Sequence, residues 1–170
     1  MYELDYTPEA ETSLGFKGID HIALAVRDLE ETLTFFTEVL GFKLNQRRRI
    51  AGEKSGMISA EVQYHDIKFV ICQGTEPASQ VSRLIEHHGP GVAHIALAVS
   101  NAEDVMKNLE SKGMQFDTSL IRGPGLTQVF SSRDINSGLS FEFIERNGEA
   151  GFLEGNVNDL FLQLEKNDKF

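Results

Sequence analysis

The sequence predicts an α+β fold in which two β-α-β-β-β modules follow one another along the chain. The main observation is a repeat: GIDHIALAV over residues 18–26 returns as GVAHIALAV over residues 91–99, with seven of nine residues identical. Each copy precedes an amphipathic helical pattern, and each helical pattern precedes three short extended segments. A duplicated module fixes an architecture more firmly than local propensity does. We therefore expect paired, curved, mixed sheets that face a common cleft.

The first module is expected over about residues 18–75. Its opening strand carries the repeat, and a helix follows where four apolar residues lie on one face: Leu29, Leu33, Phe36 and Leu40. Gly41 is suited to cap the C-terminus of this helix. Three strands are then expected, at FKLNQ (42–46), SAEVQY (59–64) and IKFVICQ (67–73).

The second module is expected over about residues 91–146 and repeats the same order. Its helix has four apolar residues on one face: Ala102, Val105, Met106 and Leu109. Gly113 follows as the C-terminal cap. The three later strands are expected at MQFDT (114–118), LTQVFSS (126–132) and LSFEFIE (139–145).

Two further helices and one extension complete the predicted chain. The stretch SQVSRLIEHHG between the modules has the apolar spacing of a short connecting helix. A final amphipathic helix over about residues 155–167 would form a lid. No linker rich in proline, glycine or serine separates the modules, so residues 18–170 are predicted to form one domain preceded by an acidic N-terminal extension over residues 1–17.

Composition limits the classes of protein to which the chain can belong. The 170 residues include 16 basic and 26 acidic side chains, and the net charge of −10 argues against binding to nucleic acid or to anionic lipid. The basic run Arg47 to Arg49 is expected to be solvated, with a local anion site as the alternative. No apolar run approaches a membrane span, and no signal peptide is evident. With Cys72 as its single cysteine the chain forms no internal disulfide, so we expect a cytoplasmic protein.

The repeat also places one histidine on the first strand of each module, His21 and His94. A lone histidine among apolar residues is usually a core residue, but two at equivalent positions can face a common cavity. In LSFEFIER, Glu142 lies between two phenylalanines and points to the face opposite them. A buried carboxylate needs a cationic partner, either an arginine or a metal. Two histidines and one carboxylate form the facial triad of Fe(II) oxygenases, so these three residues are predicted to bind a metal.

The duplicated HIALAV module resembles the vicinal oxygen chelate superfamily, which includes glyoxalase I, methylmalonyl-CoA epimerase, extradiol dioxygenases and 4-hydroxyphenylpyruvate dioxygenase. The resemblance covers nearly the whole predicted domain and implies metal binding by His21, His94 and Glu142. Glyoxalase I and the epimerase have an oxygen-bearing side chain at a fourth position, which falls at about Val70, or at Gln73 if the alignment shifts. Valine cannot bind a metal, so this departure argues against both activities.

The second half of the chain resembles the C-terminal, catalytic half of 4-hydroxyphenylpyruvate dioxygenase and hydroxymandelate synthase. The matching stretches are SQVSRLIEHHGPGVAHIAL, LTQVF and SFEFIERNGEAGFLEGNVNDLF. The last of these extends beyond the point where glyoxalases and epimerases normally end. This resemblance implies a substrate pocket lined by Gln80, Gln128, Phe130, Phe152 and Asn156 and closed by the C-terminal helix.

Several positions depart from the pattern of that family. Val157 stands where the family has a phenylalanine over the aromatic substrate, Ala60 lies near the position of a pocket serine, and Thr75 near that of an asparagine. The family's additional N-terminal domain and the long insertion before its LLQIF segment are missing from this sequence. The resemblance therefore implies the iron site but not 4-hydroxyphenylpyruvate as the substrate.

Together these features predict a mononuclear Fe(II) dioxygenase that acts on a small 2-oxo acid, or a similar chelating substrate, and O2. Ni(II), Co(II), Zn(II) and Mn(II) stay open as alternative ions. Gln80 and Gln128 would orient the substrate, Phe130 and Phe152 would form an apolar wall, and the helix that includes Asn156 would exclude water. A homodimer is expected by analogy with the superfamily.

Three alternatives share the predicted fold. A glyoxalase- or epimerase-type lyase or isomerase would transfer protons without oxygen. An extradiol dioxygenase would use the same triad and an additional acid-base histidine, for which His65 is a candidate, although His65 beside Asp66 is more simply a turn between strands. A non-catalytic module resembling bleomycin-resistance proteins would bind a ligand in the cleft without needing a metal.

Overall fold

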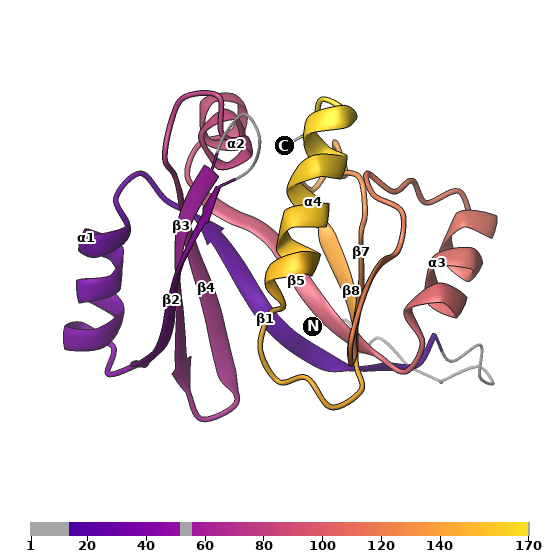
Figure 1. Ribbon diagram of the computed structural model, residues 1–170, viewed down its shortest axis with the longest axis horizontal. Coiled ribbons are helices and arrows are strands. Elements are labelled where there is room, and N and C mark those ends of the chain that lie inside the picture. Colours follow the sequence, from indigo (N-terminus) through magenta and orange to yellow (C-terminus); the bar gives the residue numbers. More distant parts are fainter. Residues whose placement is uncertain (1–13, 52–55, 170) are drawn as a thin grey trace, which may run out of the picture.

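The computed structural model describes residues 14–51 and 56–169, which form a curled mixed sheet and four α-helices (Figure 1). The sheet has eight strands in the order β2-β3-β4-β1-β5-β8-β7-β6. Strands of the first module are β1 (Phe16–Ala25), β2 (Lys43–Ala51), β3 (Gly56–Tyr64) and β4 (Ile67–Gly74). Strands of the second are β5 (Gly91–Val99), β6 (Ile121–Gly123), β7 (Leu126–Phe130) and β8 (Phe141–Arg146). The predicted α+β class and the tandem modules are confirmed.

Equivalent strands pair in the same way in the two modules. Strand β1 runs parallel to β4, as β5 does to β8, and the two halves join through the antiparallel pair β1 and β5. The registers also correspond: Ala23 lies opposite Val70 in the first module, and Ala96 lies opposite Glu142 in the second. Val70 is therefore the structural counterpart of Glu142, as the sequence predicted.

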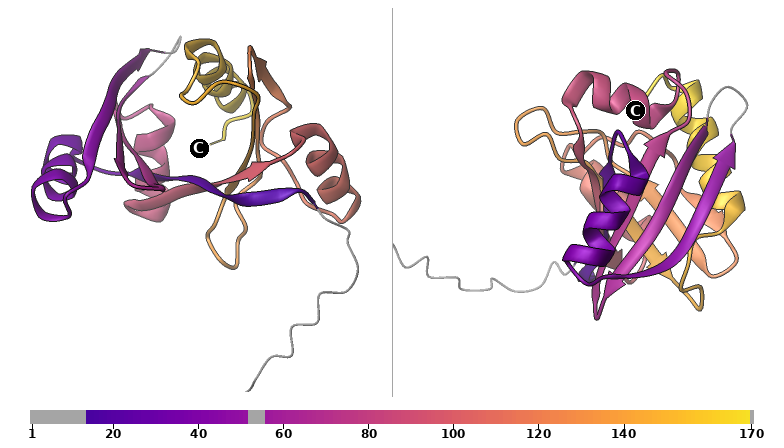
Figure 2. Two further views of the ribbon diagram at one scale, coloured as in Figure 1. Left: turned by 90° about the horizontal axis from the view of Figure 1, so that it is seen from below. Right: turned by 90° about the vertical axis from the view of Figure 1, so that its left-hand side faces the viewer.

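The sheet curls into a half-barrel with helices on both of its surfaces (Figure 2). Helices α1 (Leu29–Thr34) and α3 (Ala102–Ser111) cover the outer surface of the first and second module, and each buries one apolar cluster there. Helices α2 (Gln80–His88) and α4 (Glu154–Lys166) lie at the open side of the half-barrel. The connecting helix and the C-terminal helix lie close to their predicted positions, and together with the sheet they enclose the cleft.

The helix after β1 departs from the prediction in its last turn. Residues Phe35–Val39 form a π-helical turn, in which the Leu40 amide donates to the Phe35 carbonyl at 3.1 Å. The wider turn rotates Leu40 out of the apolar face, so that it is 45% exposed, and Phe42 packs against the cluster instead. The expectation that Leu40 shares the apolar face of this helix with Leu29 and Leu33 is therefore wrong. Gly41 follows with φ of 76°, as a C-terminal cap requires.

The prediction of a strand at MQFDT (114–118) is also wrong. In that segment only Phe116 forms a bridge, with Ser131, and the regular strand β6 starts later, at Ile121. The Thr118 hydroxyl accepts a hydrogen bond from the Phe130 amide at 3.1 Å, so a side chain takes the place of a strand carbonyl. The chain leaves the sheet at this point and rejoins it at β6.

The remaining predictions about chain organisation are tested only in part. Most of the predicted N-terminal extension lies outside the described residues, and β1 begins at Phe16, two positions before the repeat. Among the helices of the described ranges, none has the length and apolar character needed to cross a membrane.

Candidate metal centre

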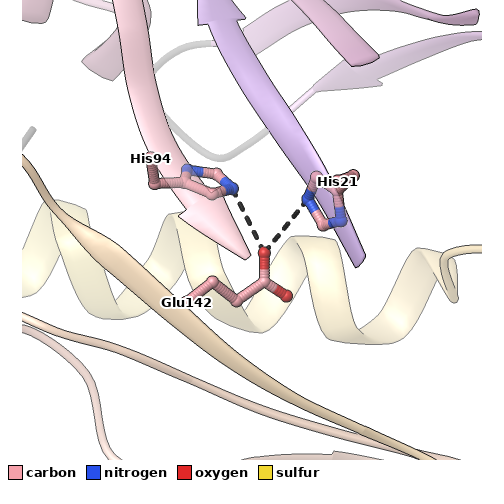
Figure 3. A group of neighbouring side chains, drawn as sticks. All are labelled: His21, His94 and Glu142. Atoms are coloured by element: carbon pink, nitrogen blue, oxygen red, sulfur yellow. Dashed lines mark ion pairs between the residues drawn. The ribbon is translucent and has the colours of Figure 1, made fainter. Parts of the chain in front are cut away.

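Three side chains converge at the centre of the cleft, where the two modules meet (Figure 3). His21 comes from β1, His94 from β5 and Glu142 from β8. One carboxylate oxygen, Oε2 of Glu142, lies 3.2 Å from Nε2 of His21 and 3.1 Å from Nε2 of His94. His21 and Glu142 are almost fully buried, whereas the His94 side chain is 21% exposed. The repeat thus brings the three predicted ligands together.

Asp20 and Arg146 fix the orientation of His21. Nδ1 of His21 lies 2.8 Å from Oδ1 of Asp20, and Arg146 donates to both carboxylate oxygens of Asp20 at 2.7 and 2.9 Å. A proton on Nδ1 that faces Asp20 leaves the lone pair of neutral His21 on Nε2, toward Glu142. When His21 gives up the proton on Nε2, it would therefore be left in the tautomer that a metal ligand requires.

The second oxygen of Glu142 is held by a chain of amides. Nε2 of Gln128 donates to Oε1 of Glu142 at 2.7 Å, and Nδ2 of Asn156 donates to Oε1 of Gln128 at 2.9 Å. Asn156 also lies 3.3 Å from the Leu126 carbonyl and belongs to α4. All three polar side chains are buried. The C-terminal helix is thus connected to the candidate ligand through two side chains.

The charges in this group support one another. Burial alone would lower the pKa of His21, but the nearby carboxylates of Glu142 and Asp20 outweigh it and raise the pKa to about 9. Burial alone would raise the pKa of Glu142, yet the two imidazoles hold it well below its ordinary value. Burial alone would also raise the pKa of Asp20, but the hydrogen bonds from His21 and Arg146 outweigh it and lower the pKa. The site therefore favours the ionised form of Glu142 and a positive charge beside it, carried either by a proton on His21 or by a metal ion.

The donor set fits a divalent metal ion. The three ligand atoms lie within 4.8 Å of one another, and the two nitrogen–oxygen distances are 3.1 and 3.2 Å. Neighbouring ligands at right angles around an ion with bonds of about 2.1 Å are roughly 3 Å apart. The separations between the carboxylate oxygen and the two imidazole nitrogens therefore match those of neighbouring positions in a coordination shell.

The first module provides no fourth ligand at the equivalent position. Val70 lines the cavity beside the triad, where it can bind no metal. Gln73 is engaged elsewhere, because its Oε1 accepts a hydrogen bond from the Leu29 amide at 2.7 Å and caps the start of α1. Glu145 does the same in the second module, where Oε2 accepts from the Ala102 amide at 2.9 Å. The alternative of Gln73 as a ligand is thus wrong, and its counterpart Glu145 is a capping residue.

A family model of the Glyoxalase/Bleomycin resistance protein/Dioxygenase superfamily matches residues 18–143. The chain belongs to this superfamily. A 4-hydroxyphenylpyruvate dioxygenase of Legionella pneumophila is 24% identical over 94% of this chain and 57% of its own length. The chain spans about half the length of the curated relatives it matches.

Solved structures share the fold of this chain. A variant of 4-hydroxymandelate synthase from Streptomyces coelicolor matches with a TM-score of 0.76 and 22% identity, over 89% of this chain and 54% of that one. Methylmalonyl-CoA epimerase from Mycobacterium tuberculosis matches with a TM-score of 0.67 and 22% identity, over 82% of this chain and 93% of that one. A synthase and an epimerase thus share the fold of this chain.

Two adjoining cavities open from the metal centre. The inner one, of about 80 Å³, contacts all three candidate ligands, and its other lining residues include Arg48, Met57, Ser59, Val70 and Val157. The second, of about 130 Å³, extends beneath α2 and α4, and its lining residues include Gln80, Leu84, Arg133, Phe161 and Leu164. Phe130 and Cys72 line both cavities. The superfamily fold therefore gives the candidate metal direct access to a pocket suited to a small molecule.

The predicted substrate-contacting residues all lie around these cavities. Gln80 is buried at the first position of α2, and the Phe130 ring lies 5.3 Å from that of His94. Phe152 meets the His21 ring edge-on at 5.0 Å. Gln128 and Asn156 act in the structure on the ligand carboxylate, as described above. The contact of these five residues with a substrate stays a prediction.

Some residues of the site were not predicted from the sequence. Asp20 and Arg146 lie 126 positions apart, so only the strand pairing brings them together. Ser59, not Ala60, lines the inner cavity, and Ala60 packs beneath α1 on the other face of β3. Successive side chains of a strand point to opposite faces of the sheet, so this alternation could have predicted that Ser59 and Ala60 lie on different faces.

His65 and the arginine run also have defined places. His65 is exposed in the turn between β3 and β4, with φ of 52°, and it lines neither cavity. The interpretation of His65 as a turn residue is confirmed, and its exposed position outside both cavities argues against a role as an acid-base residue. Arg47 is exposed and pairs with Glu30, as expected of a solvated strand, whereas Arg48 reaches the inner cavity.

Proposed function

We propose that the chain is a non-haem Fe(II) dioxygenase that acts on a small 2-oxo acid or a similar chelating substrate. The observation that carries the proposal is the triad of His21, His94 and Glu142 with Val70 at the fourth position. Three protein ligands on one side of an ion leave its remaining positions to substrate and oxygen. The similarity to 4-hydroxyphenylpyruvate dioxygenases over 94% of the chain supports the same activity class.

Each group around the triad has a defined task in this proposal. A bound Fe(II) ion would activate dioxygen and bring both reactants together. Asp20 holds His21 in the ligating tautomer, and Gln128 holds the Glu142 carboxylate. Phe130 and Phe152 place apolar surface beside the two histidines, and α4 covers the cavity. Exclusion of water protects reactive species from side reactions.

A lyase or isomerase is the second candidate, since the epimerase fold covers the same two modules. Such enzymes move protons at a metal-chelated substrate and need no oxygen. Val70 weighs against this candidate, because the position equivalent to Glu142 carries no oxygen atom. A ligand-binding module without catalysis is the third candidate, and it does not account for the buried carboxylate between two imidazoles.

Oxygen consumption distinguishes these candidates. Protein reconstituted anaerobically with Fe(II) is mixed with oxygenated buffer and a panel of 2-oxo acids, catechols and methylglyoxal–thiol adducts. The proposal predicts oxygen uptake with at least one 2-oxo acid, loss of uptake in Glu142→Gln, and unchanged uptake in Glu110→Gln, which alters an exposed glutamate on α3. Turnover of an adduct with Ni(II) or Co(II) and without oxygen would favour the lyase.

The oligomeric state is a separate part of the proposal. We propose a homodimer, as in many members of the superfamily. Light scattering of the purified protein measures the mass directly, and a single species near the 18.9 kDa of one chain would contradict the dimer.

A further inference from the structure

Arg48 differs from the other arginines near the metal centre. Arg47 pairs with Glu30 and Arg146 with Asp20, whereas Arg48 forms no ion pair within residues 14–51 and 56–169. Its guanidinium donates to the Phe152 carbonyl and, at 2.8 Å, to Oε1 of Gln46, both of which are uncharged. Its positive charge therefore has no carboxylate partner in the described part of the chain.

This charge lies on the wall of the cavity that contains the triad. Arg48 and Ser59 are direct partners across the antiparallel pair β2 and β3, and both line the inner cavity with His21 and Glu142. Ser59 is only 7% exposed, and adjoining wall positions, including Met57 and Val70, are apolar. A guanidinium and a hydroxyl on neighbouring strands form a pair of donors suited to a carboxylate.

One aromatic ring, that of Phe152, lies between Arg48 and the candidate ligand His21. The Phe152 ring lies 5.0 Å from the His21 ring and 5.8 Å from Cζ of Arg48. A short carbon chain that follows the cavity wall past Phe152 would connect a group at the metal with a group at Arg48. Two carboxylates lie near Arg48 without forming an ion pair with it: Glu149 accepts from the Gly151 amide at 2.7 Å, and Glu154 is exposed and lines a separate surface hollow together with Arg48.

We propose that Arg48 and Ser59 form a carboxylate-binding subsite, so that the substrate is a small organic acid with a second carboxylate besides its metal-chelating group. This inference rests on the function proposed above and specifies its substrate class. Because Arg48 also holds the Phe152 carbonyl just before α4, a carboxylate at Arg48 lies next to the start of the lid.

The test compares two acids that differ only at the far end. Protein loaded anaerobically with Fe(II) is titrated by calorimetry with 2-oxoglutarate and with 2-oxovalerate, which have the same carbon chain and end in a carboxylate or a methyl group. A charge-assisted hydrogen bond in a cavity predicts about tenfold or tighter binding of the diacid. In Arg48→Gln the two acids should bind about equally with unchanged iron content. Arg47→Gln, which removes the same charge from an exposed position, should keep the preference.

The outcomes separate this inference from the proposed function. If iron is retained and the two acids bind equally to the wild type, the subsite is overturned while the metal site stands. If no iron is retained, the proposed function fails, and the subsite is then tested on metal-free protein with glutarate and valerate by ligand-observed NMR. A preference for glutarate that depends on Arg48 supports the subsite, and its absence overturns it.

Discussion

At the scale of single residues, the candidate ligands depend on side chains that cannot touch a metal. Glu142 has one oxygen toward both histidines and the other on Gln128, so its carboxylate has little freedom to turn. His21 is held in the same way by Asp20. Partners of this kind set both the orientation and the basicity of metal ligands. The affinity for a metal should therefore respond to substitutions one step behind the triad.

Asp20→Asn tests this dependence. The amide keeps the size of the carboxylate but removes the charge that orients the Nδ1 proton of His21, and it also breaks the pair with Arg146. We expect the affinity for Fe(II) or Mn(II) to fall about 10- to 100-fold. Asp159→Asn, on the exposed face of α4, is the control. Equal affinities of the two variants in a competition with a chelator would show that Asp20 plays no such role.

Val70→Glu tests the importance of the missing fourth ligand. A carboxylate at the position equivalent to Glu142 would complete a four-ligand set and occupy a coordination position. We expect tighter binding of Zn(II) or Ni(II) and loss of oxygen uptake with Fe(II). Val70→Leu controls for side-chain size. Oxygen uptake that persists in a metal-loaded Val70→Glu protein would count against the three-ligand account.

The pH dependence of stability tests whether water reaches the Cys72 thiol, which lines both cavities. Burial raises the pKa of its thiol from 9.0 to about 12, so the folded state favours the protonated form. The thiol's contribution to stability is complete below pH 9 and declines as the pH rises toward 12. For metal-free protein, the free energy of unfolding of the wild type should fall relative to Cys72→Ala by about 1.4 kcal/mol per pH unit in this range. Urea titrations measure the free energies of unfolding of both proteins. If the difference between the wild type and Cys72→Ala stays constant with pH, the thiol is solvated.

At the scale of elements, the two modules use the same device to start their helices. Gln73 at the end of β4 caps α1, and Glu145 at the equivalent place on β8 caps α3. Both side chains satisfy an amide that the helix itself leaves unpaired. Strands β4 and β8, which carry Val70 and Glu142, are thereby attached to the helices on the outer surface of the sheet.

Removing either cap should destabilise the protein by a similar amount. Glu145→Ala and Gln73→Ala each leave one helix amide without its acceptor, and we expect a loss of about 1 kcal/mol in the free energy of unfolding. Urea titration monitored by circular dichroism measures the loss, with Glu110→Ala as the exposed control. Gln73 is assigned as a purely capping residue, so Gln73→Ala should lose stability but keep its affinity for the metal. A markedly weaker metal affinity in folded Gln73→Ala would contradict this assignment.

Elements were predictable from the sequence where the apolar period was regular, and unpredictable where the hydrogen bonds depart from the regular helix or sheet pattern. The strands with His21 and His94 and the helices α2 and α4 follow directly from repeat and periodicity. The missing strand near Thr118 and the π-helical turn before Leu40 depend on local hydrogen bonds that periodicity does not encode. Tertiary contacts decide such places.

At the scale of the whole molecule, duplication explains why one site forms from two modules. The halves meet through β1 and β5, so the first strand of each brings its histidine to the same central cleft. Only the second module supplies a carboxylate, and the position of Val70 makes the site asymmetric. The triad was predictable because the repeat marks equivalent positions. The Asp20–Arg146 pair and the Arg48–Ser59 pair were not, because they depend on the register between strands.

The proposed site would hold one metal ion with three protein ligands and leave its other coordination positions open. Titration of metal-free protein with Mn(II), followed by water proton relaxation, measures both properties at once. We predict one ion per chain with rapidly exchanging water on the ion, and at least a tenfold weaker site in Glu142→Gln, in which a charged ligand is lost. Binding of equal strength in the wild type and in Glu142→Gln, or no binding by the wild type, would contradict the proposed metal site.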